Sequence, residues 1–226
     1  MLFSFITIHP KLVESYGELG VFRAAQDKGL AKIQSVNLRD FGVDRRGSID
    51  DLPYGGGDGM IMRPEPLAAA VRSLCSNTAV VMPTPTGQLF NHHSIEKLLR
   101  LGRPLAFVCG RFGGVDQRFV DTYVDYEFSL GDFIVSGGEL PALMMLDGIL
   151  RQIPGVLGDP RSASYDSFGS GFNYGLEHPQ YTRPPSFEGH FVPDVLRSGD
   201  HDKIASWKKQ ESKHRTARLR PDLLDH

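Results

Sequence analysis

The chain has 226 residues, of which 40% are hydrophobic and 23% are charged, a composition typical of globular proteins with one or two domains. No stretch approaches the roughly 20 apolar residues of a membrane-spanning helix, and the apolar N-terminal segment is too short and lacks the basic flank of a signal peptide. Two cysteines provide no disulfide framework and indicate a reducing compartment. We therefore expect a soluble, cytoplasmic protein.

Apolar runs alternate with helical patterns through the first two thirds of the chain. The runs that predict strands are 2–8, 33–38, 78–82, 105–108 and 123–129. The segments that predict helices are about 10–16, 21–28, 65–74, 93–101, 115–122 and 139–152. A long loop at 40–59, a turn at 83–87 and a glycine-punctuated loop at 130–138 complete this part. Strands separated by helices predict an α/β domain with a mostly parallel sheet.

The composition changes at Pro154. Residues 154–193 are rich in Gly, Pro, Ser and Tyr and have no regular period, which predicts a linker that becomes ordered on binding. The remaining 194–226 predict a small helical domain, with an amphipathic helix at 200–218 whose apolar residues are Ile204, Ala205 and Trp207. The expected domains are therefore 1–153 and 194–226, joined by the linker.

The charges are unevenly distributed along the chain. The net charge of −2 argues against a nucleic-acid partner, but Lys203 to Arg220 holds seven Lys or Arg and one acid. In contrast, Phe112 to Asp159 holds eight acids and two bases. Such asymmetry is typical of a chain that binds a polyanion with one segment. A solvated basic helix explains the pattern equally well, and this feature alone does not separate the two interpretations.

Several common catalytic motifs are missing from the sequence. The glycine-rich stretch 54–59 is not a phosphate-binding P-loop because no Gly-Lys-Ser/Thr follows it, and its spacing does not match a dinucleotide fingerprint. His92 and His93 are adjacent, and no cysteine pair has metal-ligand spacing. A G-x-S-x-G nucleophile elbow is also absent. These absences disfavour kinases, dehydrogenases, zinc enzymes and serine hydrolases.

Three loops follow predicted strands of one sheet, at 83–87, 109–114 and 130–139. In open α/β sheets, ligands bind outside the carboxyl ends of the strands, and glycines there let backbone groups approach a flat ligand. Any one of these loops alone is more often a plain turn. Together the three predict a single pocket made mainly of backbone, although composition does not identify its ligand.

Longer motifs give the chain a family resemblance. They are LPYGGGDGM at 52–60, VCGRF at 108–112, SLGDFIVSGGELPA at 129–142, IPGVLG at 153–158, DSF at 166–168 and HPQYTRP at 178–184. With these motifs in this order, the chain resembles the bacterial tRNA (guanine-N1)-methyltransferase family, TrmD, from about residue 6 to residue 224. The resemblance implies methyl transfer from S-adenosylmethionine to N1 of the guanosine at tRNA position 37, 3′ of the anticodon. It also implies a homodimer with the SPOUT fold, whose parallel sheet contains a deep trefoil knot, and leaves Mg²⁺ open as a further cofactor.

The resemblance assigns roles to individual residues, none of them as metal ligands. Those implied to contact the cofactor are Met82, Pro83, Thr84, Pro85, Gly110, Leu130, Gly131, Asp132, Phe133, Ile134, Val135, Gly137 and Gly138. Those implied to bind tRNA are Arg183, Lys208, Arg215 and Arg218. Asp166 matches the family's general base, which is supplied to the pocket of the opposite subunit, and Arg151 matches the cation that faces guanine O6. By themselves, an aspartate in a linker turn and an arginine at a helix end are unremarkable.

The sequence departs from the family pattern beside the Cys-Gly-Arg motif. Gly113 stands where relatives usually carry an acid, and Phe112 replaces the commoner tyrosine. A missing carboxylate at this position places cofactor orientation and magnesium-linked activity in doubt. Two alternatives therefore stay open: a SPOUT methyltransferase that acts on another RNA, and a catalytically weakened tRNA-binding protein.

Overall fold

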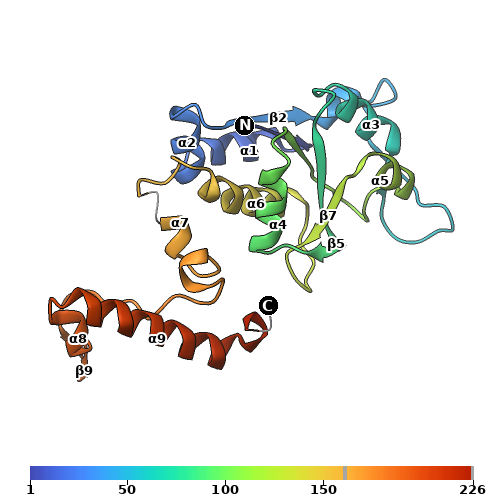
Figure 1. Cartoon of the computed structure of the whole chain (residues 1–226). Coiled ribbons are helices and arrows are strands. Elements are labelled where there is room, and N and C mark those ends of the chain that lie inside the picture. The colour runs from blue at the N-terminus through green and yellow to red at the C-terminus, as the bar shows by residue number, and fades with distance from the viewer. Residues whose placement is uncertain (160–161, 225–226) are drawn as a thin grey trace. The chain divides into compact units, whose positions relative to one another are not determined.

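A computed structural model describes residues 1–159 and 162–224. The chain forms two compact units, Met1–Leu157 and Gly158–His226. Figure 1 shows the sheet and its helices in the first unit and the long C-terminal helix in the second. In the described residues, no helix is long and apolar enough to cross a membrane.

The N-terminal unit is built on a five-stranded sheet in which every pair of neighbouring strands is parallel. Across the sheet the order is β2 (Lys32–Asn37), β1 (Leu2–Thr7), β6 (Leu105–Val108), β5 (Ala79–Leu89) and β7 (Tyr126–Ser129). This confirms the predicted α/β class. Because parallel strands are buried on both faces, they are read in the sequence as continuous apolar runs rather than as alternating patterns.

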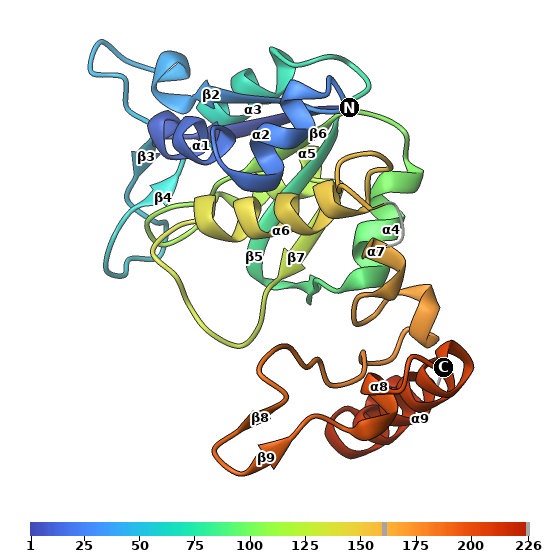
Figure 2. The same cartoon turned by 90° about the vertical axis from the view of Figure 1, so that its left-hand side faces the viewer.

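Helices cover both faces of the sheet and bury two separate apolar clusters. One face is covered by α1 (Pro10–Gly17), α2 (Gly20–Asp27), α4 (His92–Arg100) and α6 (Glu139–Gln152). The other is covered by α3 (Pro64–Arg72), α5 (Gln117–Tyr123) and the 3₁₀ turn η1 (Leu38–Phe41). Successive strand residues alternate between the clusters, so that Phe107 faces α6 while Val108 faces α3 and α5. Figure 2 shows α6 crossing the same face that α1 and α2 cover.

The predicted turn at 83–87 is wrong, because β5 continues through it to Leu89. Both Pro83 and Gln88 pair with Phe128 of β7, so the residues between them bulge out of the ladder. The prolines and glycine that indicated a turn therefore mark a bulge, which breaks the hydrogen-bonding pattern without ending the strand.

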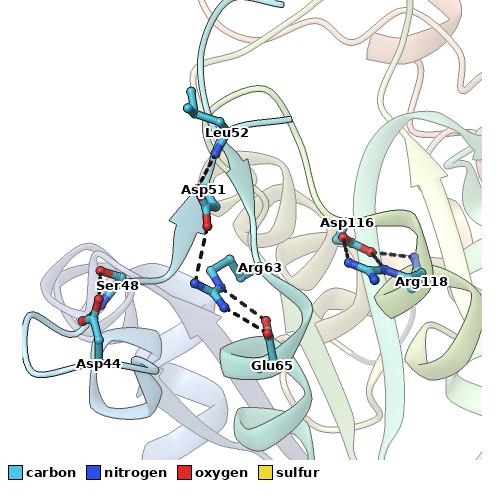
Figure 3. A network of polar contacts seen from close by, with 8 residues as sticks. All are labelled: Asp44, Ser48, Asp51, Leu52, Arg63, Glu65, Asp116 and Arg118. Carbon is cyan, nitrogen blue, oxygen red and sulfur yellow. Dashed lines mark hydrogen bonds and ion pairs between the residues drawn. The ribbon is translucent and has the colours of Figure 1, made fainter. Parts of the chain in front are cut away.

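The long loop between η1 and α3 is held by short-range polar contacts and by a two-stranded pair, β3 (Asp50–Asp51) with β4 (Ile61–Met62). Asp44 accepts hydrogen bonds from the backbone and the hydroxyl of Ser48, at 3.0 and 2.7 Å. Arg63 bridges Asp51 and Glu65 across the base of the loop, as Figure 3 shows. The segment is therefore ordered although its sequence has no regular period.

The C-terminal unit is made of short elements around one long helix. The short ones are α7 (Ser162–Tyr165), η2 (Ser170–Phe172), the pair β8 (Ser186–Phe187) and β9 (His190–Phe191), α8 (Asp194–Arg197) and η3 (Pro221–Leu223). The segment predicted as a linker thus carries secondary structure. The helix predicted at 200–218 is present as α9 (His201–Leu219), capped by the side chain of Asp200.

The expectation that α9 is amphipathic is wrong. Its buried residues are Ser212 and Thr216, and the Ser212 hydroxyl donates to the Leu176 carbonyl at 2.6 Å. Ala205 is exposed, and Ile204 and Trp207 are half-buried. The helix is therefore anchored by hydroxyl groups rather than by an apolar stripe.

Candidate functional site

A pocket of about 370 Å³ lies between the bulged part of β5 and the loops that follow β6 and β7. The bulge and the two loops belong to three neighbouring strands and form the walls of the pocket, so the three segments predicted to form one pocket do so. All but one of the residues expected to contact the cofactor line it, namely Met82, Pro83, Thr84, Pro85, Gly110, Leu130, Gly131, Phe133, Ile134, Val135, Gly137 and Gly138. The exception is Asp132, whose neighbours line the pocket while Asp132 itself is exposed outside it.

Backbone contacts hold the loops after β6 and β7 together. The Gly138 amide donates to the Gly110 carbonyl at 2.9 Å. A Cβ atom on Gly138 would lie 2.9 Å from the Cα of Cys109, closer than side chains approach a backbone, so only glycine fits there. Beyond this contact, Phe133, Ile134 and Val135 are exposed on the same loop. The pocket therefore combines a rigid backbone floor with apolar side chains at its edge.

Two charged residues line the described pocket, Arg111 and Glu127. The Thr86 hydroxyl donates to Glu127 at 3.4 Å. Neither charged residue was among those predicted, although Arg111 is part of the motif that carried the resemblance. Of the acids between 112 and 159, Glu127 is the one that lines the pocket.

The structure gives a physical reason for glycine at 113. Its amide donates to the Met60 carbonyl at 2.8 Å, and an added Cβ would lie 3.0 Å from that oxygen. A longer side chain therefore requires the loop at Met60 to shift. Phe112 precedes it in the left-handed region, with φ of 59°.

A cysteine next to the pocket is excluded as a nucleophile. Cys109 is buried, and burial raises the pKa of its thiol well above the ordinary value, with the charge of Glu139 acting in the same direction. Nucleophilic cysteines need the opposite shift, toward the thiolate. Cys109 is therefore not a candidate nucleophile for chemistry in this pocket.

The two residues expected to be catalytic occupy different units. Arg151 is in the last turn of α6, whereas the pocket contacts the first turn. Because an α-helix rises about 1.5 Å per residue, Arg151 lies about 20 Å from Gly138 along the helix axis. Asp166 follows α7 in the C-terminal unit and is half-buried. Within one chain, the N-terminal unit thus does not bring Arg151 to its own pocket.

The residues expected to bind tRNA lie on the C-terminal unit. Lys208, Arg215 and Arg218 are on α9, and Arg183 is exposed before a cis proline. Lys208 also lines a second cavity, of about 720 Å³, bordered by further lysines of α9 and by aromatic side chains of the preceding segment. A grouping of three or more metal-ligating side chains is not found in the described ranges.

Comparison with known proteins decides the family. The model of the tRNA (guanine-1)-methyltransferase TrmD family matches residues 1–226. The chain belongs to this family. It is 45% identical to the tRNA (guanine-N(1)-)-methyltransferase of Geobacter sulfurreducens over 227 residues, which is 99% of this chain and 91% of the relative. It is 46% identical to the enzyme of Neisseria meningitidis over 229 residues, 100% of this chain and 90% of the relative.

The family membership confirms the resemblance seen in the motifs. Methyl transfer to guanine N1 in tRNA, with S-adenosylmethionine as donor, is the activity of this TrmD family member. The relative from Citrifermentans bemidjiense has the same name and is 44% identical over 228 residues, 100% of this chain and 90% of the relative. The family model matches residues of both units, so the C-terminal unit is part of the family's fold and not an addition to it.

Proposed function

We propose that the chain methylates the guanosine at tRNA position 37, directly 3′ of the anticodon, using S-adenosylmethionine bound in the pocket between the bulge of β5 and the loops after β6 and β7. The observation that supports this proposal most strongly is the pocket itself, in which a bulge of one strand and glycine-rich loops after its two neighbours form one cavity. The proposal includes the deep trefoil knot of SPOUT folds, and the close approach of Gly138 to Gly110 supports it.

The pocket fits the chemistry of an adenosine ligand. Its volume is within the roughly 300–1,000 Å³ of small-molecule sites, and such sites combine apolar walls with a few polar groups. Leu130 and Phe133 supply apolar walls, and the backbone of 110 and 137–138 supplies polar groups. When bound, the cofactor would supply a methyl group activated by a cationic sulfur. Glu127 is a carboxylate placed to favour that charge.

Residues of this chain would perform the proton transfer. Guanine N1 carries a weakly acidic proton, and its lone pair attacks only as that proton leaves. A carboxylate within hydrogen-bond reach is the natural acceptor, and we assign this role to Asp166. Loss of the proton places negative charge on guanine O6, which the guanidinium of Arg151 would stabilise.

We further propose that a homodimer assembles the complete site. Arg151 lies too far along α6 to reach its own pocket, so it must be supplied by a second copy. Leu140 and Met144 are exposed on α6, and Arg151 lies seven residues after Met144 on the same face. An apolar face that leads to the catalytic cation is well suited to an interface between subunits.

The C-terminal unit would hold the anticodon stem. Arg183, Lys208, Arg215 and Arg218 would contact phosphates, which position a nucleic acid without reading its sequence. We infer a cytoplasmic location, because tRNA is the proposed substrate. We assign no residues and no step to Mg²⁺.

One experiment tests the proposed function. Labelled methyl groups from S-adenosylmethionine should enter bulk tRNA, and nucleoside analysis should recover them as 1-methylguanosine. A transcript with adenosine at position 37 is the matched control and should stay unlabelled. Label in a different nucleoside would favour a methyltransferase of another specificity. Cofactor and tRNA binding without transfer would favour a weakened tRNA-binding protein.

A further inference from the structure

A buried carboxylate beneath the pocket has no role in the mechanism above. Glu139 is the first residue of α6, and its side chain is 1% exposed. One of its oxygens accepts a hydrogen bond from the Thr7 hydroxyl at 2.7 Å, and Thr7 is the last residue of β1. The other oxygen lies 3.0 Å from Nε of Arg111. Glu139 therefore connects the end of β1 with the loop that follows β6.

Arg111 extends this connection to the loop after β7. Its Nη1 donates to the Ser136 carbonyl at 3.0 Å, and its backbone amide contacts the Met62 sulfur at 3.1 Å. The side chain passes directly over Gly137, where an added Cβ would lie 2.3 Å from Nε of Arg111. Because Arg111, Ser136 and Gly137 all line the pocket, this arginine joins two of its walls.

Stability alone does not account for this arrangement. A buried ion pair is often no more stable than apolar residues of the same shape. Here the geometry is also imperfect, because Nε of Arg111 and Oε2 of Glu139 form no hydrogen bond although they lie close together. Buried polar atoms left in this state cost stability. An arrangement that costs stability and touches the pocket walls is better explained by what it does to the pocket.

We propose that Glu139 is a positioning residue, which orients Arg111 so that the loop 131–138 is fixed over the cofactor pocket before the cofactor arrives. The inference rests on the proposed cofactor site and adds a residue that does not touch the ligand. A loop that is already fixed loses less conformational entropy when the cofactor binds. Loss of Glu139 should therefore weaken the affinity for the cofactor. The methyl-transfer step uses other groups and keeps its rate once the cofactor is bound.

Glu139→Gln tests the inference, because it keeps the shape and an acceptor for Thr7 while removing the charge that holds Arg111. Calorimetry should show S-adenosylhomocysteine binding about 10- to 100-fold more weakly, within the usual range for coupling between a group outside a binding site and the affinity of that site. In the ligand-free protein, amides of 131–138 should exchange hydrogen faster, while kcat at saturating cofactor should change less than about threefold. Glu96→Gln is the control, since it removes a glutamate paired with Arg100 at 2.7 Å on the surface of α4.

A second pair of variants keeps the inference testable if Glu139→Gln does not fold. Thr7→Val removes the hydroxyl that orients Glu139 and should weaken cofactor binding, whereas Thr7→Ser retains it and should not. If wild-type protein binds S-adenosylhomocysteine and both Glu139→Gln and Thr7→Val bind it equally well, the positioning role is wrong. If wild-type protein fails to bind it, the proposed cofactor site itself is wrong. Slower turnover with unchanged affinity and exchange would also overturn the inference.

Discussion

The two units of this chain hold their structure by different means. The N-terminal unit buries two apolar clusters on either side of its sheet, with Phe5 and Phe107 in ring contact at 5.1 Å between centroids. Among the described residues of the C-terminal unit, the buried side chains are polar, namely His178, Ser212 and Thr216. Ring contacts of the half-buried Trp207 with the buried His178 and with Tyr181 add to these polar contacts.

This difference corresponds to a division of labour. A closely packed core can hold backbone groups in place, which a pocket built from backbone requires. The second unit buries few apolar side chains, and basic residues on α9 suit it to contact the phosphates of a polar surface such as tRNA, as proposed above. The comparison predicts that substitutions at the pocket of the first unit alter cofactor binding, whereas those in the second unit alter RNA binding and the proton transfer.

The largest expected effect comes from Asp166 in the C-terminal unit. Asp166→Asn preserves shape but removes the proton acceptor, so turnover should fall by about 10²–10⁴-fold. Cofactor and tRNA affinity should change little, because the proton moves only in the transition state. Single-turnover kinetics with purified tRNA and separate binding titrations measure the two quantities. Weaker binding of tRNA with unchanged turnover would instead make Asp166 part of the RNA contact.

Mixed dimers sharpen this prediction. Asp166→Asn chains combined with chains carrying a defective pocket should regain activity, because one site per heterodimer then has both an intact pocket and an intact base. Arg151→Ala should complement the same partner, since Arg151 is about 20 Å along α6 from its own pocket. Mixtures as inactive as their parents would show that each site is built from one chain.

The next largest effect concerns the pocket in the N-terminal unit. Gly131 has φ of 147° and an added Cβ would lie 3.1 Å from the Phe133 ring, so Gly131→Val should distort the loop. S-adenosylhomocysteine at a hundredfold excess over its Kd should raise the free energy of unfolding of wild-type protein by about 2.7 kcal/mol, and it should not stabilise the variant. Thermal unfolding with and without the ligand measures this stabilisation.

Gly102→Val provides the matched control for Gly131→Val. Gly102 also has positive φ, 61°, but nothing lies within 4 Å of an added Cβ and the residue is outside the pocket. Gly102→Val should lower the Tm of the free protein without changing the rise in Tm on addition of S-adenosylhomocysteine. A retained shift in Gly131→Val would place the cofactor elsewhere.

A smaller effect is expected for the lysines of α9. Replacing Lys208 and Lys209 with Ala should weaken the binding of all substrate tRNAs alike. It should also reduce the slope of log binding constant against log salt concentration by about one to two units. Lys11→Ala with Lys32→Ala, on exposed positions of the first unit, is the control and should leave the slope unchanged. A change in nucleotide preference at constant affinity would contradict the phosphate-contact role.

The smallest effect is a pH dependence of the N-terminal unit. Hydrogen bonds from Ser48 lower the pKa of Asp44. In the same way Arg63 lowers the pKa of Glu65 in the first turn of α3, and Arg118 lowers the pKa of Asp116 (Figure 3). A lowered pKa means that these carboxylates stabilise the fold fully above the ordinary value near 4 and lose that contribution as the pH falls through the lowered one. Asp44→Asn should therefore reduce the fall in Tm between about pH 5 and pH 3. An unchanged pH profile would show that the contacts in Figure 3 have no net effect on stability.

Local patterns account for what could be predicted of the fold and the site. Apolar runs give the five strands and helical periods give the helices, because both depend on residues close in sequence. Glycines after Cys109 and after Ser136 mark where backbones approach closely, so the pocket-lining loops were predicted correctly. The same reasoning failed at Pro83, where turn-forming residues sit in a bulge whose partner is Phe128 of β7.

The sequence by itself determined the α/β class, the family and the loops that line the pocket, since these are encoded in contiguous motifs. Only the tertiary structure decided that Thr7 and Glu139, 132 residues apart, share a hydrogen bond beneath that pocket. It also decided that α9 is anchored through Ser212 and Thr216 rather than through an apolar stripe. The physical reason is that propensity and periodicity act within a few residues. Which buried polar groups meet, by contrast, depends on how the parallel strands are ordered in space.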